Sequence, residues 1–257
     1  MGGASAPSGS SGPSGWPTRP PVPDDVAHQL LRGGTLELVG RMPWSSNGTY
    51  LASVGDERGE MLVIYKPRQG ERPLWDFRTG TLCQREVAAF EVSAAFGWEI
   101  VPDTVLRDGP LGVGSVQRFV DHDPEEHYFT LLATHAEELR RFGVFDIVIN
   151  NTDRKGGHCL LGEDGHVWGI DHGVTFHEHW KLRTVIWDFA GDALSSVERD
   201  GLDCVVRSLD GSLGAGLAPL LSPTEIAATR ARVEHLLERG RFPVADDDYH
   251  NFPWPLV

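Results

Sequence analysis

The stretch INNTDRKGGHCLLGEDGHVWGIDHG (Ile149–Gly173) decides how this chain is interpreted. Two aspartates, Asp153 and Asp171, flank what the sequence predicts to be a short β-hairpin, HCLLGEDGHVWGI. An aspartate in an irregular segment after a helix can accept a proton from a hydroxyl group. A carboxylate at a strand end, here followed by His-Gly, is well placed to hold a divalent cation that bridges phosphates. Each aspartate alone is equally compatible with an ordinary turn, so the surrounding sequence has to separate the two interpretations.

Three short β-rich runs upstream of this stretch alternate with turn residues. They are TLELVG (35–40), TYLASV (49–54) and MLVIYKP (61–67), separated by the turns SSNG and GDERG. This pattern predicts an antiparallel meander. The next segment, TLCQREVAAFEVSAAFG, predicts a helix that begins with a capping box, Thr81-x-x-Gln84, and ends at Gly97. SVQRFV (115–120) predicts a further strand, and the polar run DHDPEEH after it predicts a hinge between two lobes.

The pattern after this hinge is mainly helical. A capping box at Thr134-x-x-Glu137 predicts a helix with one apolar face, formed by Leu139, Phe142, Phe145 and Ile149. A last helix is predicted between a cap at Ser222 and a stop at Gly240, with Pro223 in its first position and Glu225 closing the box. The order of elements predicts an α+β chain with an antiparallel-sheet N-lobe and a mostly helical C-lobe.

Composition sets the domain limits and excludes several classes of protein. Residues 1–25 are rich in Gly, Ser and Pro and predict a disordered tail, followed by an N-lobe (26–120) and a C-lobe (121–257). The net charge of −14, without a dense Lys/Arg run, disfavours nucleic acid and anionic membrane partners. Three widely spaced cysteines predict no disulfide framework and a cytoplasmic location.

Lys66 lies at the end of the apolar run MLVIYK, on the strand face that carries Leu62 and Ile64. A lysine on a core face needs a carboxylate or phosphate partner, because burying it unpaired is costly. Glu86, early on the next helix, can supply that partner. Taken alone, Lys66 is also compatible with a strand-end lysine whose ammonium group reaches water.

The turn SSNG precedes this strand by one hairpin and could present backbone N–H groups to phosphates. Taken alone, it is equally compatible with a plain hairpin turn. Phosphoryl transfer needs a phosphate cover, a Lys–Glu ion pair, an aspartate that positions a hydroxyl group, and carboxylates for metal. The chain contains candidates for all of these parts in the order found in kinases, which favours a kinase-like function.

With these motifs, the chain resembles the phosphatidylinositol 3-/4-kinase superfamily of atypical kinases, and most of all the type II phosphatidylinositol 4-kinases. SSNGTYLASV resembles the family's nucleotide loop, IYKP its lysine strand and REVAAFEVSAAFGWEIVPDTV its following helix. GSVQRFV resembles the adenine-binding hinge, NNTDRKGGH the catalytic loop and GIDHGVTF the metal-binding loop. The resemblance covers roughly Leu38 to Gly191 and implies a two-lobed, protein-kinase-like fold.

The resemblance implies ATP and a divalent cation, Mg²⁺ or Mn²⁺, as cofactors. It implies that Asp153 orients or deprotonates an acceptor hydroxyl, while Lys66, set by Glu86, contacts the ATP phosphates. The remaining implied site residues are the phosphate-covering Ser45, Ser46, Asn47, Gly48 and Thr49, the adenine-binding backbone of Gln117, Arg118, Phe119 and Val120, and the metal ligands Asp171 and His158.

Two departures from the family pattern affect the expected metal and acceptor. His158 stands where the family has Asn, and an imidazole suits Mn²⁺ or Zn²⁺ better than Mg²⁺. The family's cysteine-rich insert is missing, since only Cys83 lies between Lys66 and Glu86. With a net charge of −14, we therefore expect the acceptor to be a hydroxyl of a protein or soluble small molecule, with no stable membrane anchor and no nucleic acid partner.

Three alternatives stay open. The same fold could transfer AMP instead of phosphate. His158 is also compatible with a nucleotide-binding pseudokinase that serves as a regulatory module. A third alternative is a metal-dependent hydrolase built on the histidines clustered in sequence, although no HExxH spacing occurs: His158, His166, His172, His177 and His179. The sequence specifies neither the acceptor nor the oligomeric state.

Overall fold

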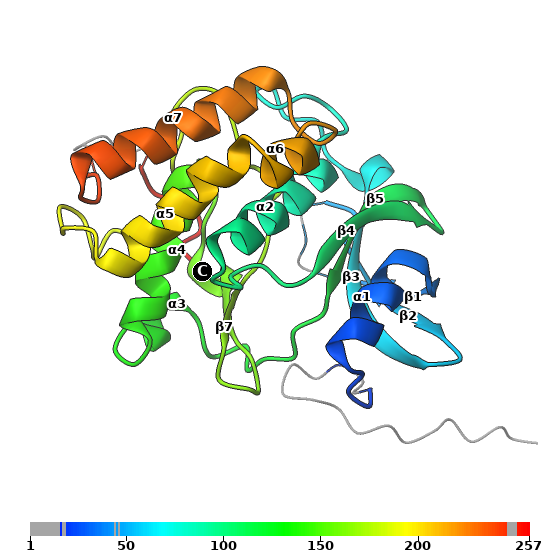
Figure 1. Cartoon of the computed structure of the whole chain (residues 1–257). Helices are drawn as coiled ribbons and strands as arrows, with labels where there is room; N and C mark the ends of the chain where they lie inside the picture. Colours follow the sequence, from blue (N-terminus) through cyan, green and yellow to red (C-terminus); the bar gives the residue numbers. More distant parts are fainter. Residues whose placement is uncertain (1–15, 17–18, 44, 46, 246–250) are drawn as a thin grey trace, which may run out of the picture.

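The computed structural model describes residues 16, 19–43, 45, 47–245 and 251–257 (Figure 1). Its main sheet has five antiparallel strands in the order β1-β2-β3-β5-β4. These strands are β1 (Thr35–Arg41), β2 (Tyr50–Asp56), β3 (Gly59–Pro67), β4 (Thr104–Gly109) and β5 (Gly112–Arg118). The predicted meander and hinge strand are confirmed. The sequence did not predict β4, because most of its side chains are half-buried and show little alternation.

The side chains of the central strand β3 point alternately to the two faces of the sheet. Val63 and Tyr65 are fully buried under α1 (Asp24–Gly33), together with Leu30 and Leu31 of that helix. Because side chains alternate along a strand, Ile64 and Lys66 point to the opposite face, where they line a cleft. Lys66 therefore lies on the central strand of the sheet and not on an edge strand.

Helix α1 was not predicted, and it begins inside the stretch predicted to be a disordered tail. Asp24 and Asp25 form its first turn, so the prediction for 1–25 extended too far at this end. Positions 1–15, 17 and 18 lie outside the described residues. The helix forms because its few apolar residues cover the sheet, and its end is stabilised by Arg107, whose guanidinium donates to the carbonyls of Leu31 and Gly34 at 2.9 Å each.

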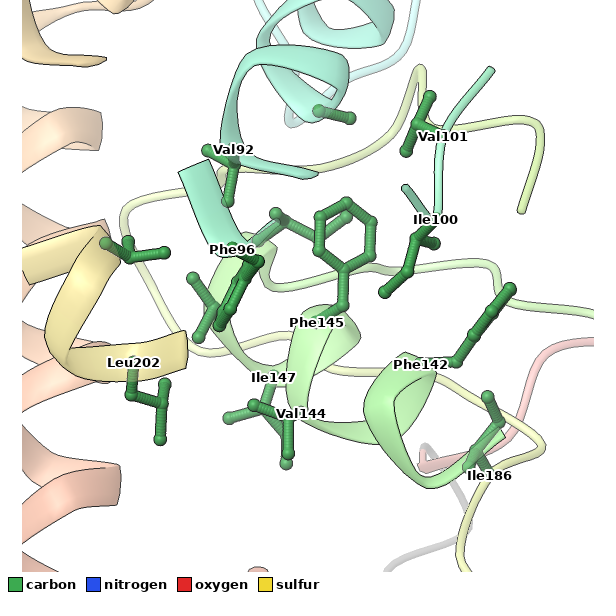
Figure 2. Packing of buried hydrophobic residues seen from close by; sticks show 14 of the residues in the cluster. Val92, Phe96, Ile100, Val101, Phe142, Val144, Phe145, Ile147, Ile186 and Leu202 are labelled. Atoms are coloured by element: carbon green, nitrogen blue, oxygen red, sulfur yellow. The ribbon is translucent and has the colours of Figure 1, made fainter. Parts of the chain in front are cut away.

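Helix α2 (Leu82–Phe96) lies between the sheet and the helical lobe (Figure 1). Its residues Val92 and Phe96 belong to the larger hydrophobic core, and Phe96 meets Phe145 edge-on with ring centroids 6.2 Å apart (Figure 2). The predicted lobe boundary at 120/121 places α2 in the N-lobe. Its buried face also packs against the helices that follow, so α2 joins the two lobes.

The two internal capping boxes were wrong. Thr81 forms no side-chain cap, and the carboxylate of Glu71 instead accepts the amides of Leu82 and Cys83 at 3.1 and 2.8 Å. Helix α4 (Ala136–Ile149) begins one residue later than predicted, with His135 as N-cap and no side-chain cap from Thr134. Glu71, which lies outside the predicted box, therefore caps α2, whereas no side chain caps α4.

The C-lobe contains the remaining elements. They are α3 (Tyr128–Leu131), α4, η2 (Gly156–His158), the hairpin β6 (Cys159–Leu161) and β7 (Val167–Gly169), α5 (Ser196–Leu209), α6 (Ser212–Leu217) and α7 (Pro223–Arg239). The hairpin between the two aspartates is confirmed. The box at the start of α7 is confirmed too, since Ser222 and Glu225 cap each other's amides and Gly240 ends the helix at φ 65°. None of the helices within the described ranges is long and apolar enough to cross a membrane.

Candidate active site

A cleft of about 400 Å³ lies where the sheet, α2 and the segments around β6 and β7 meet. It is lined by every predicted site residue that the structure describes: Ser45, Asn47, Gly48, Thr49, Lys66, Glu86, Gln117, Arg118, Phe119, Val120, Asp153, His158 and Asp171. Ser46 lies outside the described residues. Segments up to 132 positions apart in sequence thus contribute to one cleft, since Met42 and Val174 both line it.

Lys66 lies between two carboxylates. Its Nζ is 2.5 Å from Glu86 Oε1 and 2.9 Å from Asp171 Oδ1. The second oxygen of Glu86 accepts the amide of His172 at 3.0 Å, which ties α2 to the loop after β7. Burial opposes the lysine's charge, but the two carboxylates outweigh it and raise the pKa of Lys66, while burial raises the pKa of Glu86. Lys66 is therefore a fixed cation at the cleft wall.

Asp171 adopts a left-handed backbone conformation, with φ 62°. This conformation is unfavourable for residues other than glycine and is common at functional sites. Its Oδ2 lies 3.4 Å from His158 Nε2. Lys66 holds the pKa of Asp171 well below its usual range, and burial lowers the pKa of His158 to about 4. An anionic carboxylate and a neutral imidazole therefore face each other at pH 7.

This pair fits a divalent cation as two of its ligands. Adjacent ligands of an ion with bonds of about 2.1 Å lie roughly 3 Å apart, close to the observed separation. The described residues hold no group of three or more His, Cys, Asp or Glu side chains that could bind a metal. A cation at this pair would therefore complete its coordination with water or with phosphate oxygens of a nucleotide, as in other phosphotransferases.

Asp153 lies in the loop that follows α4. The helix ends at Asn150, which is left-handed at φ 52°, and the side chain of Asn151 accepts the amide of Asp153 at 3.0 Å. Burial raises the pKa of Asp153, although Lys155, 3.0 Å from its Oδ2, opposes the shift. A carboxylate with a raised pKa is a better proton acceptor in a transfer step than a strongly acidic one. The sequence had not singled out Lys155.

A buried ion pair connects this loop to the Asp171 segment, and sequence reasoning missed it. Arg154 and Asp146 are both fully buried, with Nη2 and Oδ1 2.9 Å apart. Arg154 also donates to the carbonyl of Ile170 at 3.0 Å and to Nε2 of His172 at 2.6 Å. The signal was present, because Asp146 interrupts the apolar run FGVFDIVI, where a carboxylate needs a partner.

The glycine turn differs from the expected phosphate cradle. The amide of Gly48 donates to the carbonyl of Gly70 at 2.8 Å, and that of Thr49 donates to Asn47 at 2.9 Å. A Cβ on Gly48 would lie 2.9 Å from Gly70 Cα, so glycine is required for this close approach. Both amides are therefore occupied, and the hydroxyls of Ser45 and Thr49, 2.7 Å apart, lie at the same edge of the cleft.

The hinge segment also has most of its backbone engaged. The amide of Arg118 donates to Asp103 at 2.8 Å, and that of Phe119 donates to Leu62 at 3.1 Å. The side chain of Gln117 donates to Thr104 at 2.9 Å and is buried. Within the described residues, the amide of Val120 has no backbone carbonyl as acceptor. If adenine contacts the hinge through a backbone amide, we therefore expect it to contact that of Val120.

The histidines do not converge on one site. His166 contacts the carbonyl of Glu99 at 2.9 Å, and His172 is buried against Arg154. His177 and His179 lie near each other on another segment, with rings 5.5 Å apart. The arrangement gives the hydrolase alternative no metal centre among the described residues.

Comparison with known proteins agrees with this geometry. The family model described as phosphatidylinositol 3- and 4-kinase matches residues 103–187, which include Asp153 and Asp171. Protein Rv2133c of Mycobacterium tuberculosis is 37% identical over 266 residues, covering 90% of this chain and 95% of that protein. Phosphatidylinositol 4-kinase gamma 4 of Arabidopsis thaliana is 28% identical over 192 residues, covering 63% of this chain but only 34% of its own length.

Solved structures give the same fold. The Golgi casein kinase matches with a TM-score of 0.54 and 17% identity, covering 90% of this chain and 81% of that chain. A second structure of it, with Mn/ADP bound, matches with a TM-score of 0.54 and 15% identity, covering 91% and 80%. At these identities the likeness shows a two-lobed kinase fold and no more. Together, the family model and the sequence relatives show that the chain belongs to the phosphatidylinositol 3-/4-kinase-like superfamily of atypical kinases, and within it to the same family as Protein Rv2133c.

Proposed function

We propose that this protein transfers the γ-phosphate of ATP to a hydroxyl group of a protein or a soluble small molecule. One observation carries the proposal: Lys66 is held between Glu86 and Asp171 in the cleft that Asp153 also lines. A fixed cation, a metal-binding carboxylate and a proton acceptor in one cleft are the parts that phosphoryl transfer uses. The family and fold support the same chemistry.

The cation would be held by Asp171 and His158. When bound, it would neutralise phosphate charge and so ease attack at phosphorus. Neutral His158 is a softer ligand than a carboxamide or carboxylate oxygen, which favours Mn²⁺ over Mg²⁺.

The reaction requires little of the protein beyond positioning and charge. Lys66 binds phosphate oxygens, and Asp153 takes the proton of the acceptor hydroxyl. The acceptor oxygen forms a bond to the γ-phosphorus while the bond from that phosphorus to the bridging oxygen breaks. ADP leaves with the electron pair, and Asp153 later passes its proton to water.

The acceptor class rests on charge and on the segment between Lys66 and Glu86. Cys83, which lies in that segment, is 1% exposed, and burial raises the pKa of its thiol to about 12. A buried, protonated thiol is a poor site for a lipid anchor. The net charge of −14 disfavours an anionic membrane surface. The plant relatives are named for phosphatidylinositol, so this lipid belongs in the test.

The test follows γ-labelled ATP with Mg²⁺ and then with Mn²⁺. Label is traced into the protein itself, dephosphorylated casein, phosphatidylinositol vesicles and free phosphate. We expect metal-dependent transfer to a protein, reduced about 10²–10⁴-fold in Asp153→Asn. ATP binding should persist in this variant and weaken in Lys66→Met. The matched control is Asp200→Asn, an exposed aspartate on α5.

Unchanged transfer in Asp153→Asn would remove the assigned proton acceptor, and absence of ATP binding with either metal would refute the proposal. Predominant labelling of phosphatidylinositol would overturn the acceptor class and keep the kinase. ATP labelled at the α-phosphate distinguishes AMP transfer, because only that reaction retains this label on the acceptor.

A pseudokinase is a second candidate, and His158 is the observation that favours it. If the imidazole prevents productive Mg²⁺ binding, ATP should bind without transfer, and His158→Asn should restore transfer with Mg²⁺. If wild type transfers with Mg²⁺ as well as His158→Asn does, this candidate is excluded.

A further inference from the structure

A second cavity, of about 790 Å³, lies beside α7 and shares no lining residue with the catalytic cleft. One wall is formed by α7 and the residues just after it, and the opposite wall by residues that follow the Asp171 segment. Its volume lies within the range of about 300–1,000 Å³ that is usual for small-molecule sites. The cavity is therefore large enough to hold a small molecule.

Three arginines line this cavity: Arg232, Arg239 and Arg241. Within the part of the chain that the structure describes, none of them has a carboxylate within 4.0 Å, whereas the guanidinium groups of Arg85, Arg140 and Arg154 each do. Three guanidinium groups that line one cavity, without carboxylate partners among the described residues, provide a local site for an anion.

Arg232 lines the cavity and is held by uncharged acceptors. It donates to the carbonyl of Val148 at 2.8 Å, to that of His177 at 3.3 Å and to the hydroxyl of Thr229 at 2.9 Å. Burial lowers its pKa to about 10, so it remains cationic at neutral pH. A partly buried cation that is not neutralised by a carboxylate gains from an anion nearby.

The other two arginines are exposed at the cavity. Arg241 makes a single long hydrogen bond, 3.5 Å to the carbonyl of Gly191, and both it and Arg239 are exposed. One carboxylate, Glu178, also lines the cavity, and it lies 3.7 Å from Nε2 of His179. The site is thus cationic on the α7 side.

Aromatic side chains complete the lining. Trp180 is 51% exposed, while Trp187 and Phe242 are packed against the core. An exposed tryptophan in a concave wall offers a flat surface on which a planar ring can stack. Apolar walls with a few converging polar groups are typical of small-molecule sites.

We propose that this cavity binds a small aromatic anion, with a phosphate or carboxylate group on Arg239 and Arg241 and a planar ring against Trp180. The site is separate from the catalytic cleft, so the proposal does not depend on kinase activity.

Calorimetric titration with three probes tests this proposal: 1-naphthyl phosphate, 1-naphthoate and inorganic phosphate. We expect one site per chain for at least one naphthyl probe, with an affinity that Lys66→Met in the catalytic cleft does not change. The double variant Arg239→Gln/Arg241→Gln should weaken binding roughly 10-fold or more, because charge-assisted hydrogen bonds are lost. The control, Arg41→Gln/Arg207→Gln, removes two exposed arginines elsewhere and should bind as wild type does.

Trp180→Ala tests the contact with the planar ring independently of the arginines. It should weaken the naphthyl probes and leave inorganic phosphate unchanged. The relative affinities of the phosphate and the carboxylate probe identify the anionic group. No binding at millimolar concentrations, equal affinity in the double variant, or weakened binding in Lys66→Met would each overturn the proposal.

Discussion

The buried pair Asp146–Arg154 leads to the sharpest prediction about stability. Asp146 accepts hydrogen bonds from Arg154, from Asn151 at 3.0 Å and from Thr184 at 3.1 Å. Asp146→Asn keeps the size of the side chain and removes its charge, so no cavity forms. The new amide group would point N–H donors at a guanidinium that can only donate. Arg154 would then be a fully buried cation without a counter-charge.

Breaking a buried pair from one side costs about 3–5 kcal/mol of unfolding free energy. Arg154 keeps its bonds to Ile170 and His172, so we expect a loss near the lower end, about 3 kcal/mol. The matched control is Asp210→Asn, which breaks the exposed pair of Asp210 and Arg230, 2.6 Å apart. Exposed pairs contribute about 0–1 kcal/mol.

Urea unfolding followed by tryptophan fluorescence measures both losses, and the chain has eight tryptophans to report on it. The double variant Asp146→Asn/Arg154→Met should be more stable than Asp146→Asn alone, because it removes the stranded charge. Equal losses in Asp146→Asn and Asp210→Asn, with no recovery in the double variant, would refute this reasoning.

Three further predictions concern packing, capping and pH. A Cβ on Gly201 would lie 2.5 Å from the Trp98 ring, so Gly201→Ala should lower the unfolding free energy by about 1–3 kcal/mol. Gly33→Ala, with nothing within 4 Å, should not lower it, and similar losses in the two variants would contradict the packing argument. Glu71→Gln weakens the cap of α2 and should lower the urea midpoint by an amount equivalent to about 1 kcal/mol; an unchanged midpoint would show that the cap is dispensable. The folded-state pKa of His158 is about 4, whereas a histidine in the unfolded chain titrates near 6.5. The unfolded state therefore binds more protons between these values, so stability should fall as pH drops from about 6.5 to 4, by roughly 3 kcal/mol from this residue. His158→Asn should show a correspondingly shallower slope in urea unfolding at several pH values, and an identical slope would exclude this assignment.

The sequence located the cleft residues because they break a local pattern. Lys66 ends an apolar strand, Glu86 lies in the second turn of a largely apolar helix, and Asp153 and Asp171 flank a hairpin. Each is a charged residue in a position where burial without a partner would be costly. Their roles remain predictions, whereas their convergence in one cleft is a property of the structure. Asp146 obeys the same rule, but its partner Arg154 lies in a loop of the C-lobe, and only the structure identifies the pair.

Capping shows where local reasoning fails. Ser222 and Glu225 cap α7 as the sequence predicts, because both partners lie within one helical turn. Thr81 does not cap α2, because Glu71, brought there by the preceding loop, reaches the same amides with a full negative charge. A cap supplied from a different segment leaves no signal at the helix it stabilises.

The sequence by itself determined the order of the elements and the chemical types at the cleft, since strand alternation, helix periodicity and turn residues act over a few neighbouring positions. Only the tertiary structure decided that α2 joins both lobes and that the amides of Gly48 and Thr49 already donate hydrogen bonds. It also decided that three arginines on and just after α7 line one cavity and lack carboxylate partners among the described residues. These features depend on contacts between segments far apart in the chain, whose energies are set by burial and packing in three dimensions. Local propensity carries no information about such contacts.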